Sequence, residues 1–285
     1  GGGTHTLSGD ITGTGTGGAQ VSGGTVALTG GTYDVAGTTR ASGGTTTITS
    51  GVTVASLGAL DVAVGTLTLT SGHALSAPTL SLTSGTLGGT DTLTVAGAST
   101  WSAGTMTGTG TTTLYGPLTL STGGNKTLAG GRTLTLTDTT TWSGNGQLTM
   151  GTNLFTTTLN NSGTFQDQNT GSPTIANQGG TTSFVNTGTY QKTGAGTTTI
   201  NPLFNNQAPG TVAVQAGTLT LGGTVTNTGT LQVGTGATLT VGSLPSSTFS
   251  SGTLHTGTYN VLGTMRLVGA NIVTNEAPII LDGSS

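Results

Sequence analysis

Short segments in which threonine alternates with an aliphatic residue recur along the whole chain, and they constrain its fold more than any other feature. Examples are Thr66–Thr70, Thr133–Thr137 and Thr238–Val241. Strict alternation gives a strand one apolar and one hydroxyl-bearing face, and β-branched threonine suits an extended backbone. Glycine interrupts the chain too often for a helix of useful length, and Glu, Lys and Arg, which favour helices, are rare. The sequence therefore predicts an all-β protein.

These segments are periodic. Most Thr-x-Thr steps start about 19–26 residues after the previous one, and one gap is about twice as long. A Thr-Trp-Ser triplet occurs at Thr100–Ser102 and again, about two such units later, at Thr141–Ser143. A third repeated feature reads Asn-(Ser/Thr)-Gly-Thr-apolar-Gln and occupies residues 161–166, 186–191 and 227–232. Three features that share one period indicate a repeat architecture.

A unit of about 21 residues has room for three short strands joined by glycine-rich turns, which is one coil of a parallel β-helix. We therefore predict a right-handed, single-stranded parallel β-helix (a β-solenoid) of about 13 coils. It forms a single solenoid over residues 1–285, with less regular coils around 153–210, where Thr-Leu steps are fewer and Asn, Gln and Phe are commoner. Inward Leu, Val and Ile stack into aliphatic ladders, and glycine occupies the corners.

Charge and composition exclude several kinds of partner. The chain has five Lys and Arg residues and a net charge of −3, so it offers no basic surface for nucleic acid. No apolar run approaches the ~20 residues that span a bilayer, and we expect no membrane insertion in this segment. Cysteine is absent, which excludes disulfides and thiolate metal sites. The chain opens within the repeat pattern and without a signal peptide, and we expect it to be a piece of a larger protein.

Several segments resemble repeats of very large bacterial extracellular proteins. These segments are residues 3–9, 22–26, 214–221, 225–231 and 236–241. The chain is similar over essentially its whole length to adhesin-like β-helix proteins of the autotransporter or filamentous-haemagglutinin type. The resemblance implies an extracellular or cell-surface stalk that serves adhesion or surface structure, with no shared catalytic residues. The partners it implies are other copies of the chain, end to end or side by side, or cell-surface, host or polysaccharide ligands.

Groups that could carry catalysis are scattered. The eight acidic residues include Asp34, Asp61 and Asp91 at comparable spacings, but isolated turn or edge positions explain them more simply than a joint active site. His5, His73 and His255 do not follow the repeat and lack metal-ligand spacing. We predict no catalytic residue, no metal site and no cofactor, and thus a protein that is not an enzyme.

The repeated polar and aromatic residues have a structural interpretation. Stacked amides can form hydrogen-bonded ladders between coils. The side chains predicted to occupy repeated structural positions are Asn161, Asn186, Asn227, Gln166, Gln191, Gln232, Trp101 and Trp142. For the two tryptophans, a sugar-stacking platform is the alternative.

The function predicted first is a non-catalytic structural or adhesive module, a rigid stalk or fibre-forming spacer. Two alternatives stay open: an ice-binding face made of Thr-x-Thr ladders, and a carbohydrate-binding or polysaccharide-degrading β-helix. An ice-binding face needs at least six coils with Thr-x-Thr in lateral register on one sheet. The threonines assigned to it are Thr45, Thr47, Thr66, Thr68, Thr111, Thr113, Thr133, Thr135, Thr197, Thr199, Thr218, Thr220, Thr238 and Thr240.

Overall fold

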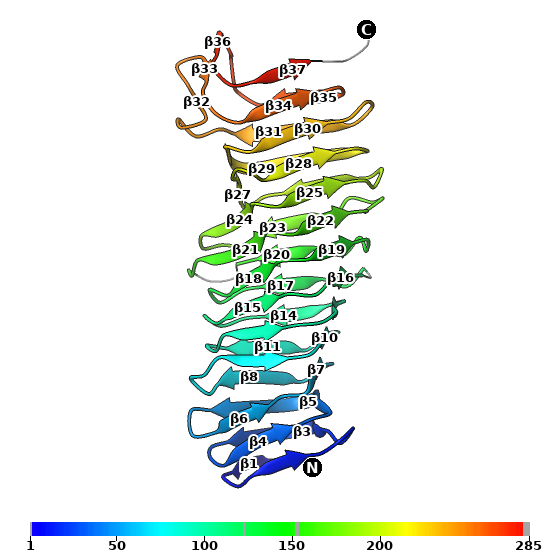
Figure 1. The fold of residues 1–285 in the computed structure, drawn as a ribbon, viewed down its shortest axis with the longest axis vertical. Coiled ribbons are helices and arrows are strands. Elements are labelled where there is room, and N and C mark those ends of the chain that lie inside the picture. Colours follow the sequence, from blue (N-terminus) through cyan, green and yellow to red (C-terminus); the bar gives the residue numbers. More distant parts are fainter. Residues whose placement is uncertain (1, 122, 152–153, 282–285) are drawn as a thin grey trace.

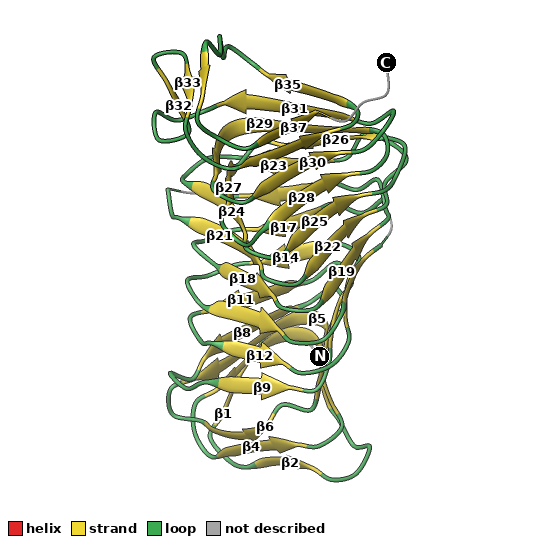
Figure 2. Cartoon of the chain, turned by 45° about the horizontal axis from the view of Figure 1, so that its top comes forward, coloured by secondary structure: helices red, strands yellow, loops and turns green. Residues whose placement is uncertain are grey.

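The computed structural model describes residues 2–121, 123–151 and 154–281, which form a long rod of stacked coils (Figure 1). The described residues are all strand or loop (Figure 2), so none of them belongs to a helix that could cross a membrane. The chain is a parallel β-solenoid of about 13 turns with a repeat of about 21 residues, as the sequence predicts. Each full coil contributes a strand to each of three faces.

The first face contains one strand from every coil, stacked at the front of Figure 1. Its strands are β1 (Thr4–Leu7), β3 (Ala19–Leu28), β5 (Thr38–Thr49), β8 (Thr66–Thr70), β11 (Thr86–Gly89), β14 (Gly104–Met106), β17 (Lys126–Leu128), β20 (Leu148–Met150), β23 (Thr174–Asn177), β26 (Thr197–Ile200), β29 (Thr218–Asn227), β31 (Thr238–Ser243) and β35 (Thr264–Leu267). Strands β3, β5 and β29 are long enough to continue around a corner onto a neighbouring face.

The second face precedes the first in each coil. It is made of the beginnings of β3 and β5, followed by β7 (Ala59–Val62), β10 (Leu80–Leu82), β13 (Ser99–Trp101), β16 (Leu118–Leu120), β19 (Thr139–Trp142), β22 (Thr164–Asp167), β25 (Thr189–Lys192), β28 (Thr211–Val214), β30 (Thr230–Val233), β34 (Thr258–Val261) and β37 (Ile279–Leu281).

The third face follows the first in each coil. Its strands are β2 (Ile11–Gly13), β4 (Thr32–Val35), β6 (Thr53–Ser56), β9 (Leu75–Ala77), β12 (Leu93–Val95), β15 (Thr111–Leu114), β18 (Thr133–Leu136), β21 (Thr157–Asn161), β24 (Thr182–Asn186), β27 (Leu203–Asn206), the end of β29, and finally β32 (Phe249–Ser250), β33 (Thr253–Leu254) and β36 (Thr274–Asn275). Among the pairings of the described strands, that of β32 with β33 is antiparallel and the others are parallel.

The core is a tube of stacked side chains. In β8, for example, Leu67 and Leu69 point inward and are buried, whereas the threonines between and beside them are half-exposed. Leu67 lies beside Leu87 of the next coil, so the aliphatic residues form columns that run along the rod. Alternation with a period of two therefore produces both the apolar interior and the hydroxyl-bearing exterior.

Coil length varies along the rod. On the first face Thr86 pairs with Thr105, whereas farther along Thr149 pairs with Ala176. On the first face the coils are longest between β20 and β26, within the region where the sequence is less regular, and they lengthen again before β35. At one corner Gly44 has φ +67° and lies against the backbone of Gly24, where a Cβ atom would overlap a carbonyl oxygen.

Candidate functional site

A column of eight consecutive threonines runs along the outside of the first face. Each lies beside the next through the parallel register of β1 to β20. Its members are Thr4, Thr25, Thr45, Thr66, Thr86, Thr105, Thr127 and Thr149, and the next position is Ala176. We call this the long threonine column. The neighbouring outward column is mixed, with Thr6, Ala27, Thr47, Thr68 and Gly88.

The threonines assigned to an ice-binding face are divided between two faces. Thr45, Thr47, Thr66 and Thr68 lie on adjacent coils of the first face. Thr111, Thr113, Thr133 and Thr135 lie together on the third face instead. The remaining six, on β26, β29 and β31, return to the first face, in columns displaced along the strands from the long threonine column. The fourteen residues therefore do not form one array.

A second long hydroxyl column lies on the second face. Its six consecutive members are Thr139, Thr164, Thr189, Thr211, Thr230 and Thr258. They are half-exposed. Outward threonine is thus a feature of more than one face.

The asparagines of the repeated motif lie inside the rod. Asn161 Nδ2 donates to Asn186 Oδ1 at 2.7 Å, and Asn186 Nδ2 donates to Asn206 Oδ1 at 2.8 Å. Asn206 Nδ2 then donates to Asn227 Oδ1 at 2.9 Å. All four side chains are fully buried, and Nδ2 atoms also donate to backbone carbonyls such as that of Thr189. This asparagine ladder satisfies polar groups that would otherwise be costly to bury.

Sequence reasoning missed Asn206. The motif is broken there because residues 207–209 replace the single Ser or Thr that precedes the glycine in the other copies. The adjacent pair Asn205-Asn206, which repeats Asn160-Asn161, is the signal that could have found it.

The glutamines of the repeated motif differ from the asparagines because they point outward. Gln166 and Gln191 are neighbours, but Ala213 separates them from Gln232.

Trp101 and Trp142 occupy the same inward column of the second face, two coils apart, with Leu120 between them. Trp101 is 1% exposed and Trp142 is 0% exposed. Rings at this depth fill the core and cannot stack on a sugar.

Aromatic residues gather farther along the core. The ring of Phe165 stacks on that of Tyr190 with centroids 5.3 Å apart, and Phe184 contacts Phe204 at 5.1 Å. Trp142 meets the edge of this cluster at Phe165. Phe165, Tyr190 and Phe184 lie in coils that are longer than the average of the rod.

An ion pair is buried beside the aromatic cluster. Lys192 Nζ lies 3.7 Å from Asp167 Oδ1, and both side chains are fully buried. The carboxylate accepts hydrogen bonds from the Tyr190 hydroxyl at 2.9 Å and from Asn169 Nδ2 at 2.9 Å. Lys192 also donates to the backbone oxygens of Asn169 and Gly194. Burial, followed by the charge of Asp167, raises the pKa of Tyr190 well above its ordinary value.

Two further cations are buried in the first half of the rod. Burial lowers the pKa of Lys126 to about 8, and its Nζ donates to the Gly124 oxygen at 2.8 Å. Burial also lowers the pKa of Arg132 to about 10, an effect that the charge of Asp91 opposes. Arg132 donates to the Thr107 and Gly89 oxygens and to the Thr112 hydroxyl. These cations hold coils together and are shielded from ligands.

The expectation that the acids are isolated, solvated residues is wrong for Asp91 and Asp167, which are buried. Asp91 accepts hydrogen bonds from the backbone and hydroxyl of Ser71 and from the Gly72 N–H, because a buried carboxylate needs donors. Asp61 pairs with Arg40 at the surface. Within the described part of the chain, no group of three or more His, Asp or Glu side chains could hold a metal ion.

Comparison with known proteins finds no matching family model, curated protein or solved structure.

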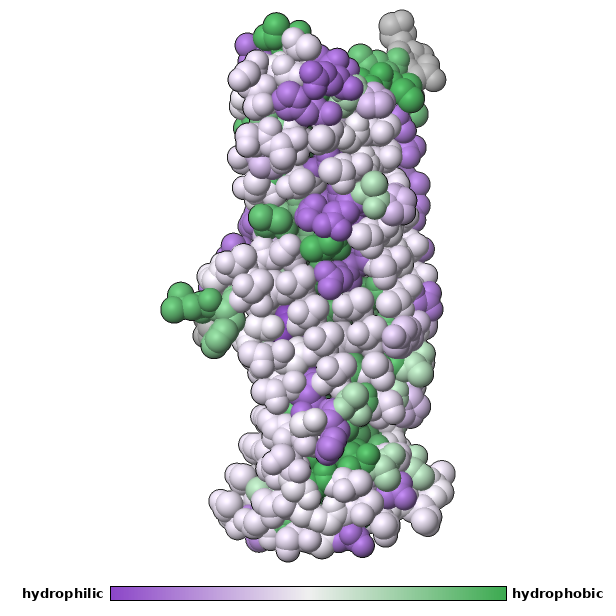
Figure 3. Space-filling view, turned by 60° about the vertical axis from the view of Figure 1, so that its left-hand side comes forward, coloured by the Kyte–Doolittle hydropathy of each residue, from purple (hydrophilic) through white to green (hydrophobic). Residues whose placement is uncertain are grey.

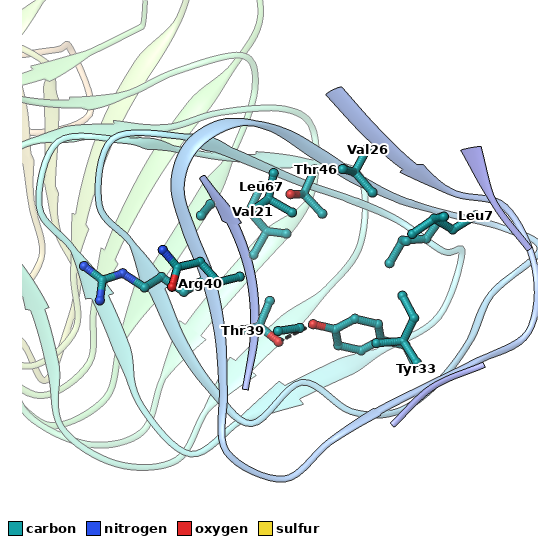
Figure 4. A pocket seen from close by; sticks show the side chains of 13 residues that line it. Leu7, Val21, Val26, Tyr33, Thr39, Arg40, Thr46 and Leu67 are labelled. Carbon is teal, nitrogen blue, oxygen red and sulfur yellow. Dashed lines mark hydrogen bonds between the residues drawn. The ribbon is translucent and has the colours of Figure 1, made fainter. Parts of the chain in front are cut away.

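The side of the rod seen in Figure 3 is mostly of intermediate hydropathy, with scattered hydrophilic and hydrophobic residues. The first coils enclose a cavity of about 300 Å³ lined mainly by apolar side chains, among them Leu7, Val21 and Val26 (Figure 4). The Tyr33 hydroxyl hydrogen-bonds the Thr39 hydroxyl at 2.7 Å in its wall. Small inward residues such as Ala41 leave this space unfilled.

Proposed function

We propose that the chain is a stiff structural module, a stalk or spacer that holds another part of a protein at a fixed distance. One observation carries the proposal. On the first face each strand from β1 to β35 pairs with the strand of the next coil, so backbone hydrogen bonds run along the whole rod. Stretching the rod along its axis requires whole coils to separate, which breaks several parallel ladders at once. We therefore assign the stacked coils a mechanical role.

The exterior supports a location outside a bacterial cell. Hydroxyl side chains cover the faces, and charged residues are 5% of the chain. Together with the resemblance of its repeats to adhesin-like β-helix proteins, this favours a secreted or surface-attached stalk whose faces make weak, repeated contacts with copies of itself or with surface polymers.

Single-molecule pulling from residues near the two ends of the rod tests the mechanical role. We expect no extension at low force and then stepwise rupture, each step releasing one coil, or about 70–90 Å of chain at the length of a fully extended residue. Smooth extension at low force would contradict the proposal.

Ice binding is the second candidate function, and the long threonine column favours it. Eight threonines at the ~4.8 Å spacing of neighbouring strands present a regular row of hydroxyl and methyl groups. The column contains no charged residue.

A thermal-hysteresis assay separates the two functions. If the column binds ice, Thr66→Lys with Thr105→Lys abolishes the hysteresis of the wild-type chain. The matched change on the second face, Thr164→Lys with Thr211→Lys, leaves it intact. A wild-type chain without hysteresis rules this function out and leaves the mechanical proposal standing.

A further inference from the structure

The last coils carry a small sheet that differs from the rest of the rod. Between β31 and β34 the chain forms a hairpin, β32–β33, which pairs in turn with β36 and lies at the upper left of Figure 1. In the hairpin Ser250 pairs with Thr253, so Ser250 and His255 lie diagonally on one face of it. The parallel register of β33 and β36 continues to place Glu276 beside His255. The hairpin thus brings together Ser250 and His255, which are 5 residues apart, and the pairing with β36 adds Glu276, which is 21 residues farther along the chain.

Their side chains form a continuous relay. Ser250 Oγ lies 2.9 Å from His255 Nε2, and His255 Nδ1 lies 2.8 Å from Glu276 Oε2. A carboxylate can only accept, so the Nδ1 atom carries a hydrogen. In the neutral imidazole Nε2 is then left to accept the serine proton. This is the arrangement of nucleophile, general base and orienting carboxylate that activates a serine.

The backbone next to the serine is strained. Ser251 has φ +50°, and it is the one non-glycine residue with positive φ in the part of the chain that the structure describes. Gly252 follows with φ +79°, so the two residues form the tight turn of the hairpin. Positive φ at a serine is costly, and such strain is concentrated at functional sites. Ser250 lies on β32 directly before this turn and is half-exposed.

We infer that Ser250, His255 and Glu276 form an acyl-transfer site that hydrolyses short-chain acyl esters of alcohols. The assignment goes beyond the structural role proposed above and uses none of the residues of the threonine columns. It also departs from the sequence-based expectation that the chain is not an enzyme, because that expectation considered the histidines and acids separately. Ser250 and His255 are the catalytic residues, and Glu276 is a positioning residue that acts through His255.

The reaction balances without a cofactor. Ser250 Oγ attacks the ester carbonyl carbon while its proton passes to His255 Nε2, which gives a tetrahedral intermediate. The C–O bond to the alcohol breaks, and the leaving alkoxide takes the proton from His255. Water then attacks the acyl-serine, giving its proton to His255, and the carboxylic acid leaves as Ser250 recovers its hydrogen.

The openness of the site determines the substrate class. The His255 side chain is 32% exposed and that of Glu276 is 60% exposed, and Ser250 beside them is half-exposed. An open site binds little of a substrate beyond the reacting group. It therefore suits a small acyl group displayed on a larger molecule, such as an acetyl-type ester on a polymer, and not a long acyl chain that needs a deep apolar pocket.

Covalent labelling of the full chain with a fluorophosphonate probe, followed by peptide mass spectrometry, tests this inference. We expect one phosphonylated residue, Ser250, and hydrolysis of p-nitrophenyl acetate above the buffer rate. Ser250→Ala and His255→Ala reduce kcat/KM by roughly 100-fold or more, to the background rate. Glu276→Gln lowers kcat by roughly 10-fold with KM unchanged, and Glu276→Asp restores part of the loss.

Ser247→Ala is the matched control, because it removes an exposed hydroxyl from the same segment. It leaves labelling and hydrolysis unchanged. An unlabelled wild-type chain, a label on a different serine, or labelling of Ser250 that persists in His255→Ala would each overturn the assignment.

Discussion

The coils before and after Trp142 both carry outward threonine columns, but their interiors differ. On the inward side of the third face the earlier coils place Ala77, Val95, Leu114 and Leu136 in one column. The same column continues in the later coils as the four members of the asparagine ladder. On the second face the inward column changes in the same way, from Trp142 to Asp167 and Lys192.

This difference shows that a solenoid can exchange an aliphatic core for a hydrogen-bonded one without changing its ladders. The coils that contain Phe165 and Phe184 are among the longer ones, but Trp101 lies in one of the shortest, so coil length alone does not determine which side chains the core encloses. Polar side chains are tolerated in the later coils because most of their polar atoms have partners: the ladder amides bond to one another, and the buried charges bond to one another and to backbone groups. The interior polar groups of the later coils should therefore be sensitive to loss of a partner, whereas the exterior should be insensitive throughout.

The largest effect should come from the buried ion pair. Asp167→Ala removes the carboxylate and leaves Lys192 charged and the Tyr190 hydroxyl unpaired in the core. We expect the free energy of unfolding to fall by about 3–5 kcal/mol. Chemical denaturation measures the change, and Asp34→Ala, at an exposed position, provides the control with an effect within about 0.5 kcal/mol.

Replacing both partners sharpens the comparison. Asp167→Leu with Lys192→Leu continues the apolar column and leaves no charge unpaired. We expect the free energy of unfolding of the double variant to exceed that of Asp167→Ala by about 3 kcal/mol. If the double variant is no more stable than Asp167→Ala, then Asp167 and Lys192 contribute more to the free energy of unfolding than the neutralisation of each other's charge.

The asparagine ladder should show the next largest effect. Asn186→Ala removes the central amide and leaves the Asn161 amide, the Asn206 oxygen and two backbone carbonyls short of a partner. We expect a loss of about 2–4 kcal/mol in unfolding free energy. Asn160→Ala changes the outward neighbour of Asn161 and should cost less than about 1 kcal/mol. Equal losses for the two variants would mean that the ladder adds nothing to stability.

In the earlier coils, buried Lys126 should make the free energy of unfolding depend on pH. Because its pKa is about 8 in the folded chain and its ordinary value is 10.5, the unfolded chain binds the proton more tightly between these two values. Stability therefore rises as the pH increases from about 8 to about 10.5, and the full penalty is present below pH 8. Lys126→Met should raise the unfolding free energy at pH 7 by about 2 kcal/mol and remove this part of the pH dependence. Identical pH profiles for variant and wild type would contradict the assignment.

The smallest effects should come from the outward threonines of either region. Thr66→Val in the earlier coils and Thr164→Val in the later ones preserve the β-branched shape and remove a half-exposed hydroxyl. We expect changes within about 0.5 kcal/mol for both in thermal or chemical denaturation. A loss above 1 kcal/mol in one region alone would show that the exteriors are not equivalent.

The alternation of threonine with aliphatic residues and the shared period were sufficient to predict the parallel solenoid and its coil length. The interior of the later coils was harder to predict. Asp167 and Lys192 have the same parity as Phe165 and Tyr190, so alternation placed them inward, but charged residues are ordinarily assigned to the surface. The proximity of Ser250, His255 and Glu276 depends on a hairpin that interrupts the repeat. The repeat pattern of the sequence does not predict this hairpin.

Distances between spin labels test most directly the claim that both regions rise equally per coil. The chain lacks cysteine, so labels can be placed at Thr45→Cys with Thr149→Cys, and at Thr139→Cys with Thr258→Cys. Each pair is five rungs apart in one column, although the second spans more sequence. Electron–electron resonance should give the same separation for both, about 24 Å plus the reach of the labels. A longer separation for the second pair, in proportion to its sequence, would contradict the stacked-coil account.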